Sequence, residues 1–476
     1  MSLTAPPDEP FEEPSAALPI SSRDALVSVA VTDEHAAHPR LVSGPLGRTI
    51  FSIALPSVGS IFLLTFFISA DAYWVGTRIG PVGLAAVSTS IFWIWAIVSL
   101  AELVSVGLTA VAARRHGEGK PELAARAVGD ALVFTLVLSL FVAVFGRIFL
   151  SSLFALEHVP PEVTALGKQY LGLYLLGAPL VFGYFTVDAS FRASGDTRTP
   201  LMLIIISVTA AVMLDPVLIL GLFGMPKLGI AGAAVSMLTT RLATIIIGVA
   251  LLVRRKMVKF GRVSFETLGS IVRVGLPTAV TGIVFSLIYV LLTQTTTQYG
   301  TPALAALGVG HRVESWVYMV GVGFGAAAAA MVGQNLGAKR PDRARRAGWI
   351  AVGMATSLGV IGAFLEYTCA VPFANFFTHD PAVIAEAAKF LRIGAMSTIF
   401  AASELVLEGA LGGAGDTLPP MLTSTFLTAM RVPLAIWAAP RWGTAGIWWV
   451  LSITAAGRGL AMMGLWKWRR WDLKKV

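Results

Sequence analysis

The stretch Asp188-Ala-Ser-Phe-Arg-Ala-Ser-Gly-Asp-Thr-Arg-Thr-Pro200 recurs later in the chain as Glu408-Gly-Ala-Leu-Gly-Gly-Ala-Gly-Asp-Thr-Leu-Pro-Pro420. The two stretches lie 220 residues apart, and other pairs keep the same offset, such as Gly117 and Gly337. Matches at one fixed offset over so many positions are not expected by chance. The chain therefore consists of two repeated halves.

The composition places these halves in a membrane. Hydrophobic residues make up 56% of the 476 residues and charged residues only 13%, which leaves too little polar surface for a soluble domain of this length. A helix that crosses the bilayer needs ~20 mostly apolar residues, and the chain contains about twelve such runs. We therefore predict an all-α integral membrane protein whose twelve transmembrane helices form two parallel-repeat six-helix bundles around a central cleft.

The number of spans in each half determines how the halves are related. Six is an even number, so both halves enter the membrane from the same side and are related by an axis along the membrane normal, as in transporters that rock one bundle against the other. Lys and Arg gather in the segments 114–126, 254–262, 339–346 and 467–475. Because basic loops stay in the cytoplasm, we predict a multi-pass protein of the cytoplasmic (inner) membrane with both termini cytoplasmic.

The predicted organisation has five parts. Residues 1–45 mix Pro, acidic residues, Ser and His without periodicity and are expected to form a disordered cytoplasmic tail. The N-terminal six-helix bundle follows over 46–253, a cytoplasmic linker over 254–269, the C-terminal six-helix bundle over 270–466 and a basic cytoplasmic tail over 467–476.

Several functional classes are disfavoured. The net charge of +9 resides in short loops, so we expect no nucleic-acid partner. The sequence lacks a phosphate-cradling G-x-x-x-x-G-K-[ST] loop, so direct use of ATP has no support. Cys369 is the only cysteine, which excludes intramolecular disulfides and multi-cysteine metal sites. The six histidines are dispersed, and no catalytic constellation indicates a membrane enzyme.

Short motifs throughout the chain resemble one known family. They are Ser69-Ala-Asp-Ala-Tyr-Trp-Val-Gly76, Leu214-Asp-Pro-Val-Leu-Ile-Leu-Gly221, Gly333-Gln-Asn-Leu-Gly-Ala338, the twin Gly-Asp-Thr segments and Gly446-Ile-Trp-Trp449. Together they look like multidrug and toxic compound extrusion (MATE) transporters over about residues 46–466. The resemblance implies an efflux transporter that exchanges H⁺ or Na⁺ for organic, often cationic, compounds. Ser286 stands near the place where one branch has a Glu, so the chain is most similar to the DinF-type branch.

Carboxylates inside apolar spans are costly and are therefore functional candidates. Asp71 lies late in the first span and Asp215 late in the fifth, so both fall in the outer half of the membrane. Pro216 lacks the amide that would bond the Val212 carbonyl, and Pro216 and Pro56 are predicted hinges. The resemblance also places the cation- or proton-binding carboxylates at Asp71 and Asp215. The structural alternative is that each Asp caps a helix or pairs with a neighbour.

The fourth span supplies three further candidates. Asp188 could bind the cation or proton, although an ion pair with Arg192 four residues later explains it equally well. Tyr170 and Tyr184 precede it in the same span and are predicted to line the substrate cleft. For any single aromatic residue, packing against lipid or between helices is the alternative.

Two departures from the family pattern bear on the coupling ion. Members with a well-formed sodium site have Asn four residues before the fifth-span Asp and Thr in the sixth span, where this chain has Ala211 and Met237. The loss of neutral oxygen ligands weakens a Na⁺ site more than a proton site, and neighbouring buried carboxylates can hold a proton near neutral pH. We therefore predict coupling to H⁺ rather than Na⁺, and no cofactor.

The second half carries its own pair of carboxylates. Glu404 and Glu408 lie one helical turn apart on the tenth span, and Glu408 is the repeat partner of Asp188. They could hold a cationic substrate or relay protons. The alternative is that they pair with Arg431 or another basic residue on the cytoplasmic side.

Together with these observations, the resemblance implies a secondary active efflux transporter, not an enzyme, that exchanges H⁺ for small organic cations or amphiphiles by alternating access, as a monomer in the lipid bilayer. The alternative is a flippase or exporter of a lipid-linked oligosaccharide or another endogenous amphiphile. Such families often add two helices and line the cavity with basic residues, whereas this chain has few basic residues inside its spans. A passive channel is a further alternative.

Overall fold

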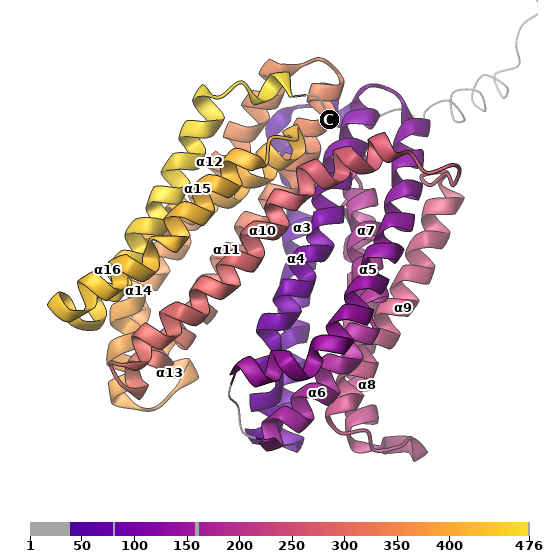
Figure 1. Ribbon diagram of the computed structural model, residues 1–476. Coiled ribbons are helices and arrows are strands. Elements are labelled where there is room, and N and C mark those ends of the chain that lie inside the picture. Colours follow the sequence, from indigo (N-terminus) through magenta and orange to yellow (C-terminus); the bar gives the residue numbers. More distant parts are fainter. Residues whose placement is uncertain (1–38, 80, 158–160, 475–476) are drawn as a thin grey trace, which may run out of the picture. The chain divides into compact units, whose positions relative to one another are not determined.

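The computed structural model describes residues 39–79, 81–157 and 161–474, which fold almost entirely into helices (Figure 1). The helices of the first half are α2 (Pro39–Ser43), α3 (Leu46–Arg78), α4 (Pro81–Gly117), α5 (Pro121–Glu157), α6 (Pro161–Leu176), α7 (Ala178–Ser194), α8 (Arg198–Leu220), the short η1 (Leu222–Gly224) and α9 (Ile230–Arg254). Those of the second half are α10 (Phe265–Thr297), α11 (Thr301–Gly337), α12 (Pro341–Thr368), α13 (Ala370–Phe377), α14 (Pro381–Ala414), α15 (Leu418–Ala429), α16 (Arg431–Trp468) and η2 (Trp471–Leu473).

The helices confirm the predicted number of spans. Within the described residues, ten helical stretches are long and apolar enough to cross a bilayer, and the bent pair of α6 and α7 supplies an eleventh. One of the ten, Leu418–Trp468, has 51 residues, or about 76 Å at 1.5 Å per residue, more than twice the ~30 Å hydrocarbon core. It contains two spans that meet at Gly443, whose φ of 59° and ψ of −148° are not helical. The total is therefore twelve.

Some predicted spans are built from two helices each. The fourth bends by 51° at Gly177, between α6 and α7. The ninth is interrupted at Cys369, between α12 and α13, and the eleventh at Met430, between α15 and α16. The start of α10 at Phe265 also falls inside the predicted linker. Hydropathy does not reveal these breaks, because the chain stays apolar on both sides of each.

The Gly-Asp-Thr segments have the same structure in both halves. Gly195 follows α7 with a φ of 92°, and Gly415 follows α14 with a φ of 80°, a left-handed conformation that glycine adopts without steric penalty. In each segment the Gly amide bonds the carbonyl three residues earlier, and the next Asp amide bonds the carbonyl five residues earlier. These matching helix ends confirm that the two halves are structural repeats.

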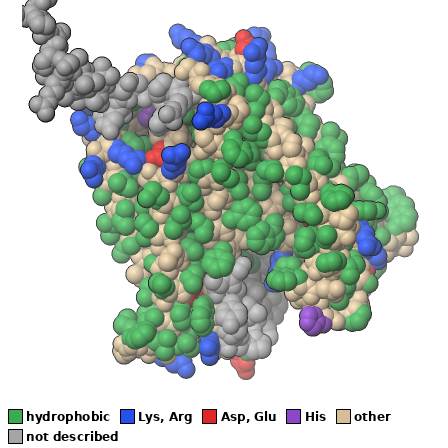
Figure 2. Space-filling model, turned by 180° about the vertical axis from the view of Figure 1, so that it is seen from behind, with side chains coloured by type: hydrophobic (Ala, Val, Ile, Leu, Met, Phe, Trp, Pro, Cys, Tyr) green, Lys and Arg blue, Asp and Glu red, His purple; other side chains and the backbone are tan. Residues whose placement is uncertain are grey.

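Many of the basic residues lie at one end of the helices, called the basic end below. It comprises the loops 118–120, 255–264 and 338–340 and the C-terminal residues 469–474. Figure 2 shows hydrophobic side chains over most of the visible flank and most of the Lys and Arg side chains toward its margins. This distribution is the one that a bilayer requires, since its core cannot solvate exposed charges.

At the basic end, α4 and α11 cross so closely that a glycine is required on each. A Cβ added to Gly117 would overlap the Gln334 carbonyl, and one added to Gly337 would overlap the Arg114 carbonyl. The internal repeat relates one contact to the other, because the two glycines are 220 residues apart and so are Arg114 and Gln334. The pseudo-two-fold axis therefore passes between these helix ends. Across the same junction, the Gln334 amide donates a hydrogen bond of 2.8 Å to the Ala193 carbonyl.

The first turns of α3 and α10 each pack against the opposite half. Ile50 and Ile53 of α3 belong to a buried cluster with residues of α11, α12, α14 and α16. Ile271 of α10 belongs to a second cluster, with residues of α4, α5, α7 and α9. The two bundles are thus joined at the basic end by helices that the repeat relates.

The predicted disordered tail over 1–45 requires a correction at its end. Residues 1–38 lie outside the described residues, but Pro39–Ser43 form α2. Leu41 is buried and packs among residues of α11. The Asn335 side chain donates to the Leu41 carbonyl at 3.1 Å, and Arg340 donates to the Val42 carbonyl at 2.9 Å. These contacts order a segment whose composition alone predicted disorder.

Asp196, in the turn between α7 and α8, makes a testable contribution to stability. Burial by itself would raise the pKa of this carboxyl, but hydrogen bonds from the Thr199 hydroxyl and amide and the ion pair with Arg255 at 2.7 Å outweigh burial and hold the pKa below its usual range. We expect Asp196→Asn to lower the free energy of unfolding by about 1 kcal/mol. Because the folded pKa is depressed, the stabilisation is complete above the unfolded pKa and is lost as the pH falls through the folded pKa.

Thermal unfolding of the purified protein in detergent, measured from neutral to acidic pH, tests this prediction. The variant should unfold earlier than the wild type near neutral pH and approach it in acid. Asp342→Asn, at an exposed position in the first turn of α12, is the matched control. A difference between wild type and Asp196→Asn that does not change with pH would contradict the electrostatic explanation.

Candidate functional site

The structure brings Asp71 and Asp215 together inside the first bundle. Asp71 of α3 is 7% exposed and Asp215 of α8 is fully buried. The Tyr170 hydroxyl of α6 donates to Asp71 Oδ2 at 3.5 Å. The two carboxylates are close enough to interact electrostatically, and the Tyr170 hydroxyl interacts with both. The first, fourth and fifth predicted spans thus contribute to one site.

Most of the carboxylate oxygens in this site have no hydrogen-bond partner. Asp71 Oδ1 and both oxygens of Asp215 are buried without one among the described residues. Ser236 of α9 lies close enough to Asp215 to interact with it, and its hydroxyl donates to the Ala211 carbonyl at 3.3 Å. A buried charge without a partner is costly, so the site needs a bound proton or cation to be neutralised. Two acidic groups and a phenol are suited to exchanging protons.

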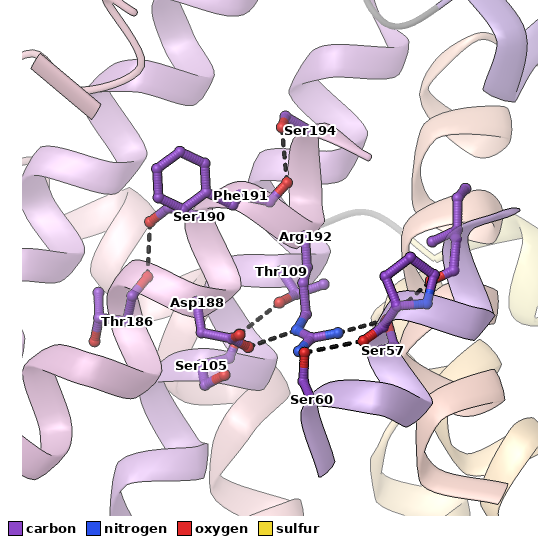
Figure 3. Close-up of polar contacts among 12 residues, drawn as sticks. Ser57, Ser60, Ser105, Thr109, Thr186, Asp188, Ser190, Phe191, Arg192 and Ser194 are labelled. Carbon is purple, nitrogen blue, oxygen red and sulfur yellow. Dashed lines mark hydrogen bonds and ion pairs between the residues drawn. The ribbon is translucent and has the colours of Figure 1, made fainter. Parts of the chain in front are cut away.

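Asp188 lies in a separate network (Figure 3). Arg192 Nε donates to Asp188 Oδ2 at 2.6 Å, which is the ion pair that the four-residue spacing allowed. Arg192 Nη1 donates to the Ser57 hydroxyl of α3 at 2.5 Å. Ser57 follows Pro56, so this network ties α7 to the predicted hinge of α3. Asp188 is not among the partners of Asp71 or Asp215 in the described structure.

The two tyrosines predicted to line the cleft are buried within the first bundle. Tyr170 is 6% exposed and contacts Asp71 as described above. Tyr184 is 9% exposed, and the Arg241 guanidinium of α9 stacks on its ring at 3.8 Å. Neither ring is presented to an open cleft in this structure. Tyr184 and Asp188 instead line a small cavity with residues of α8 and α9.

In the second bundle, Glu404 has a different partner from the one considered in the sequence. Arg458 of α16 lies 3.3 Å from Glu404 Oε1, and the Ser424 hydroxyl donates to the same oxygen at 3.4 Å. Arg431 donates instead to the Thr454 hydroxyl at 2.9 Å and the Tyr289 hydroxyl at 3.0 Å. The predicted kind of pairing is present, but with Arg458.

Glu408 faces the first bundle. The contact between Val106 of α4 and Gly412 of α14, where an added Cβ would lie 3.6 Å from Val106 Cγ1, fixes the register of these helices. Glu102 and Glu408 lie one turn before these two residues, and they interact electrostatically with each other and with Tyr318 of α11. Three carboxylates and Arg458 therefore lie where the bundles meet.

Four charged residues inside the bundles are not among the site residues predicted from the sequence: Glu102, Arg241, Glu366 and Arg458. Each is visible as a charge inside an apolar run. The partners were not visible, because they come from other helices. Four arginines, Arg192, Arg241, Arg431 and Arg458, lie within helices and interact with neighbouring side chains.

Twelve spans in two parallel repeats, with carboxylates buried inside one bundle and others where the two bundles meet, define an integral membrane transporter rather than an enzyme. A family model described as MatE matches residues 56–217 and 277–437, two segments in corresponding positions of the two halves. The chain therefore belongs to the MATE family of multidrug and toxic compound efflux transporters.

Individual relatives agree with this assignment. The chain is 27% identical over 370 residues to the probable multidrug resistance protein YoeA of Bacillus subtilis, covering 76% of this chain and 80% of that protein. It is 28% identical over 353 residues to a protein of Shewanella oneidensis named FAD transporter, covering 72% and 77%. A solved MOP superfamily transporter from Pyrococcus furiosus has the same fold, with a TM-score of 0.85 at 22% identity over 92% of this chain and 98% of that chain.

Proposed function

We propose that this protein exports organic cations or amphiphiles in exchange for protons by alternating access, as a monomer in the inner membrane. The observation that carries the proposal is the pair of buried carboxylates, Asp71 and Asp215, whose oxygens largely lack partners and which both interact with the Tyr170 hydroxyl, the donor to Asp71. Such a site is neutral only when it holds a proton or a cation. We place the basic end and both termini in the cytoplasm, in keeping with the distribution of Lys and Arg.

The scarcity of neutral oxygen ligands supports H⁺ over Na⁺. Sodium prefers a shell of several oxygen atoms, whereas a proton needs only one carboxylate oxygen. Among the side chains that the structure describes, the neutral hydroxyls that interact with Asp71 or Asp215 include those of Tyr170 and Ser236, and the Ser236 hydroxyl also donates to the Ala211 carbonyl. Ala211 and Met237 contribute no side-chain oxygen.

A mechanism follows from this arrangement. When the bundles meet at the basic end, a proton from outside binds at Asp71 and Asp215 and removes their negative charge. Loss of that charge changes the packing of α3 against α8, and α3 bends at Pro56. The hydrogen bond between Arg192 and Ser57 couples this bend to α7. The substrate is then expelled outward, and the proton leaves to the cytoplasm after the bundles rock.

A second candidate substrate class is an anionic amphiphile, the chemistry of a lipid-linked exporter. The arginines inside the helices favour it, and so does the relative named FAD transporter. Arg241 is the most suitable of these arginines, because its Nη1 is buried without a hydrogen-bond partner among the described residues. Arg192 and Arg458 form ion pairs with Asp188 and Glu404, and Arg431 donates to the Thr454 and Tyr289 hydroxyls.

Transport by the purified protein in proteoliposomes tests the proposal. A pH gradient and a sodium gradient are imposed separately, with ethidium as the cationic substrate and FAD as the anionic one. We expect ethidium transport under the pH gradient and none under the sodium gradient. Transport driven only by sodium would overturn the assignment of the coupling ion, and transport of FAD but not ethidium would move the proposal to the second class.

A further inference from the structure

The second bundle contains an ionisable group that the proposed mechanism does not use. His311 and Glu314 lie one turn apart on α11, with His311 Nδ1 3.3 Å from Glu314 Oε2. The imidazole is packed edge-on against Tyr289 of α10 at 5.0 Å and Phe390 of α14 at 5.8 Å. Its Nε2 is buried without a hydrogen-bond partner among the described residues.

A second carboxylate lies beside this pair. Glu366 of α12 is 2% exposed, and its Oε2 accepts a hydrogen bond of 2.7 Å from the Thr398 hydroxyl of α14. Its other oxygen, Oε1, is buried with no hydrogen-bond partner in the part of the chain that the structure describes. Glu366 and Glu314 interact electrostatically. A fully buried carboxylate with an unpaired oxygen is the feature that also marks Asp215.

One turn of α14 holds the two carboxylates near each other. A Cβ added to Gly394 would lie 2.8 Å from Glu314 Oε1, so the lack of a side chain there makes room for that carboxylate. One turn later, Thr398 bonds Glu366, and its hydroxyl is also 3.4 Å from the Gly394 carbonyl. Glu314 and Glu366 therefore meet across the Gly394–Thr398 turn.

We propose that His311, Glu314 and Glu366 form a second proton-binding centre, located in the C-terminal bundle. Two neighbouring carboxylates, one of them fully buried, cannot both stay charged without a compensating cation. Among the described residues, neither has an ion pair with Lys or Arg. The centre therefore holds a proton that can move between Glu366 and the His311–Glu314 pair as its surroundings open and close.

The groups facing this centre are consistent with that role. Tyr289 of α10 faces His311, and Arg431 of α16 donates to the Tyr289 hydroxyl rather than to a carboxylate. Arg312, the next residue on α11, is directed toward the Phe377 ring of α13 at 5.9 Å. The nearby Glu386 forms an ion pair with Lys389 and accepts a hydrogen bond from the Trp448 indole. In the described part of the chain, therefore, no cationic side chain takes the place of the proton.

The internal repeat does not relate this second centre to the site at Asp71 and Asp215. At the 220-residue offset, the counterparts of its members are Ile91, Ile94 and Gly146, and the counterparts of Asp71 and Asp215 are Leu291 and Ala435. Each bundle has its own ionisable centre, built on different helices. Protonation of the second centre does not depend on the proposed function, although its use in transport rests on proton antiport.

Labelling with dicyclohexylcarbodiimide tests the proposal directly. This reagent modifies protonated carboxyl groups in apolar surroundings, and mass spectrometry of peptides locates the modified residue. In the detergent-purified full chain we expect Glu366 to be labelled, and the labelling should fall as the pH is raised and the carboxyl loses its proton. Glu366→Gln verifies the site of modification. Absence of labelling at Glu366 at every pH, or protection by Na⁺, would overturn the assignment of a proton site.

Two variants separate a proton centre from a merely structural carboxylate. Glu314→Gln removes the neighbouring negative charge that favours protonated Glu366, so labelling at a given pH should fall several-fold. Gly394→Ala should act in the same direction, because its methyl group displaces Glu314, the flexible end of a side chain. Gly353→Ala, whose added Cβ meets nothing within 4 Å, is the matched control. Unchanged labelling in Glu314→Gln would contradict the shared centre.

The same experiment on Asp215→Asn separates this inference from the proposed function. If the first centre drives transport, this variant loses transport and keeps the labelling of Glu366. Wild-type protein that transports ethidium under the pH gradient but is never labelled at Glu366 would count against the second centre alone.

Discussion

Replacement of Asp215 by Asn should reduce proton-driven dye efflux about tenfold or more, the largest effect expected of any single side chain. Asn has the shape of Asp but cannot take up or release a proton, and both oxygens of Asp215 are buried without hydrogen-bond partners among the described residues. The substitution leaves the first bundle permanently neutral at this position, so the step that requires the charged form is blocked. Asp71→Asn should have a similar effect.

The measurement is ethidium efflux from proteoliposomes under a pH gradient, together with substrate-induced proton movement reported by a pH-sensitive dye. Binding of ethidium, followed by fluorescence anisotropy, should be retained in both variants, because a neutral carboxamide does not disturb the fold. Glu122→Gln, an exposed residue paired with Lys259 at 3.2 Å, is the control for a lost surface carboxylate. Proton movement that persists in Asp215→Asn would show that the coupling group lies elsewhere.

Asp188→Asn should give a different result, because Asp188 is paired. Its removal leaves the Arg192 charge, 11% exposed, without its carboxylate, and breaking a buried ion pair in this way costs about 3 kcal/mol. We expect a marked fall in the thermal stability of the purified protein. Wild-type stability with lost proton coupling would identify Asp188 as a coupling residue instead.

The sequence predicted the fold because the fold depends on features that are local or repeated. A run of apolar residues is sufficient to predict a span, and the Gly195 and Gly415 turns recur because both halves need a left-handed residue at the same place. The breaks at Gly177 and Cys369 were not predictable from hydropathy, since a bent span is as apolar as a straight one. The sequence did not predict that Leu41 is ordered and buried, because its partners lie on α11, far along the chain.

The sequence identified individual residues of the candidate site, but not which of them lie in contact. Asp71 and Asp215 were identified because a charge in an apolar run is costly wherever it occurs. Which charges pair was not predictable: Glu404 bonds Arg458 rather than Arg431, and Glu366 bonds a threonine on another helix. These pairings depend on helix rotation and crossing points, which are set by close contacts such as that of Val106 with Gly412. Hydropathy contains no information about them.

Gly117→Ala should prevent the bundles from meeting at the basic end and should lower transport about tenfold or more. The added methyl group would overlap the Gln334 carbonyl, which belongs to the backbone and cannot turn aside as a side chain could. Gly337→Ala should have the same effect through Arg114, because the repeat exchanges the two contacts. Both substitutions act between the bundles, so each bundle should still fold.

A maleimide assay separates blocked closure from general damage. Val106→Cys is placed in a background in which Cys369, the only native cysteine, is replaced by Ala. With Gly117→Ala added, the introduced thiol should react several-fold faster with a water-soluble maleimide, since the contact of residue 106 with Gly412 opens. Gly353→Ala is the same substitution at a helix position where the added Cβ meets no atom within 4 Å. It should change neither transport nor reactivity. If Gly117→Ala carries ethidium at the wild-type rate, the close crossing of α4 and α11 is not a state through which the transport cycle passes, and the two bundles must rock about contacts other than those that the repeat conserves.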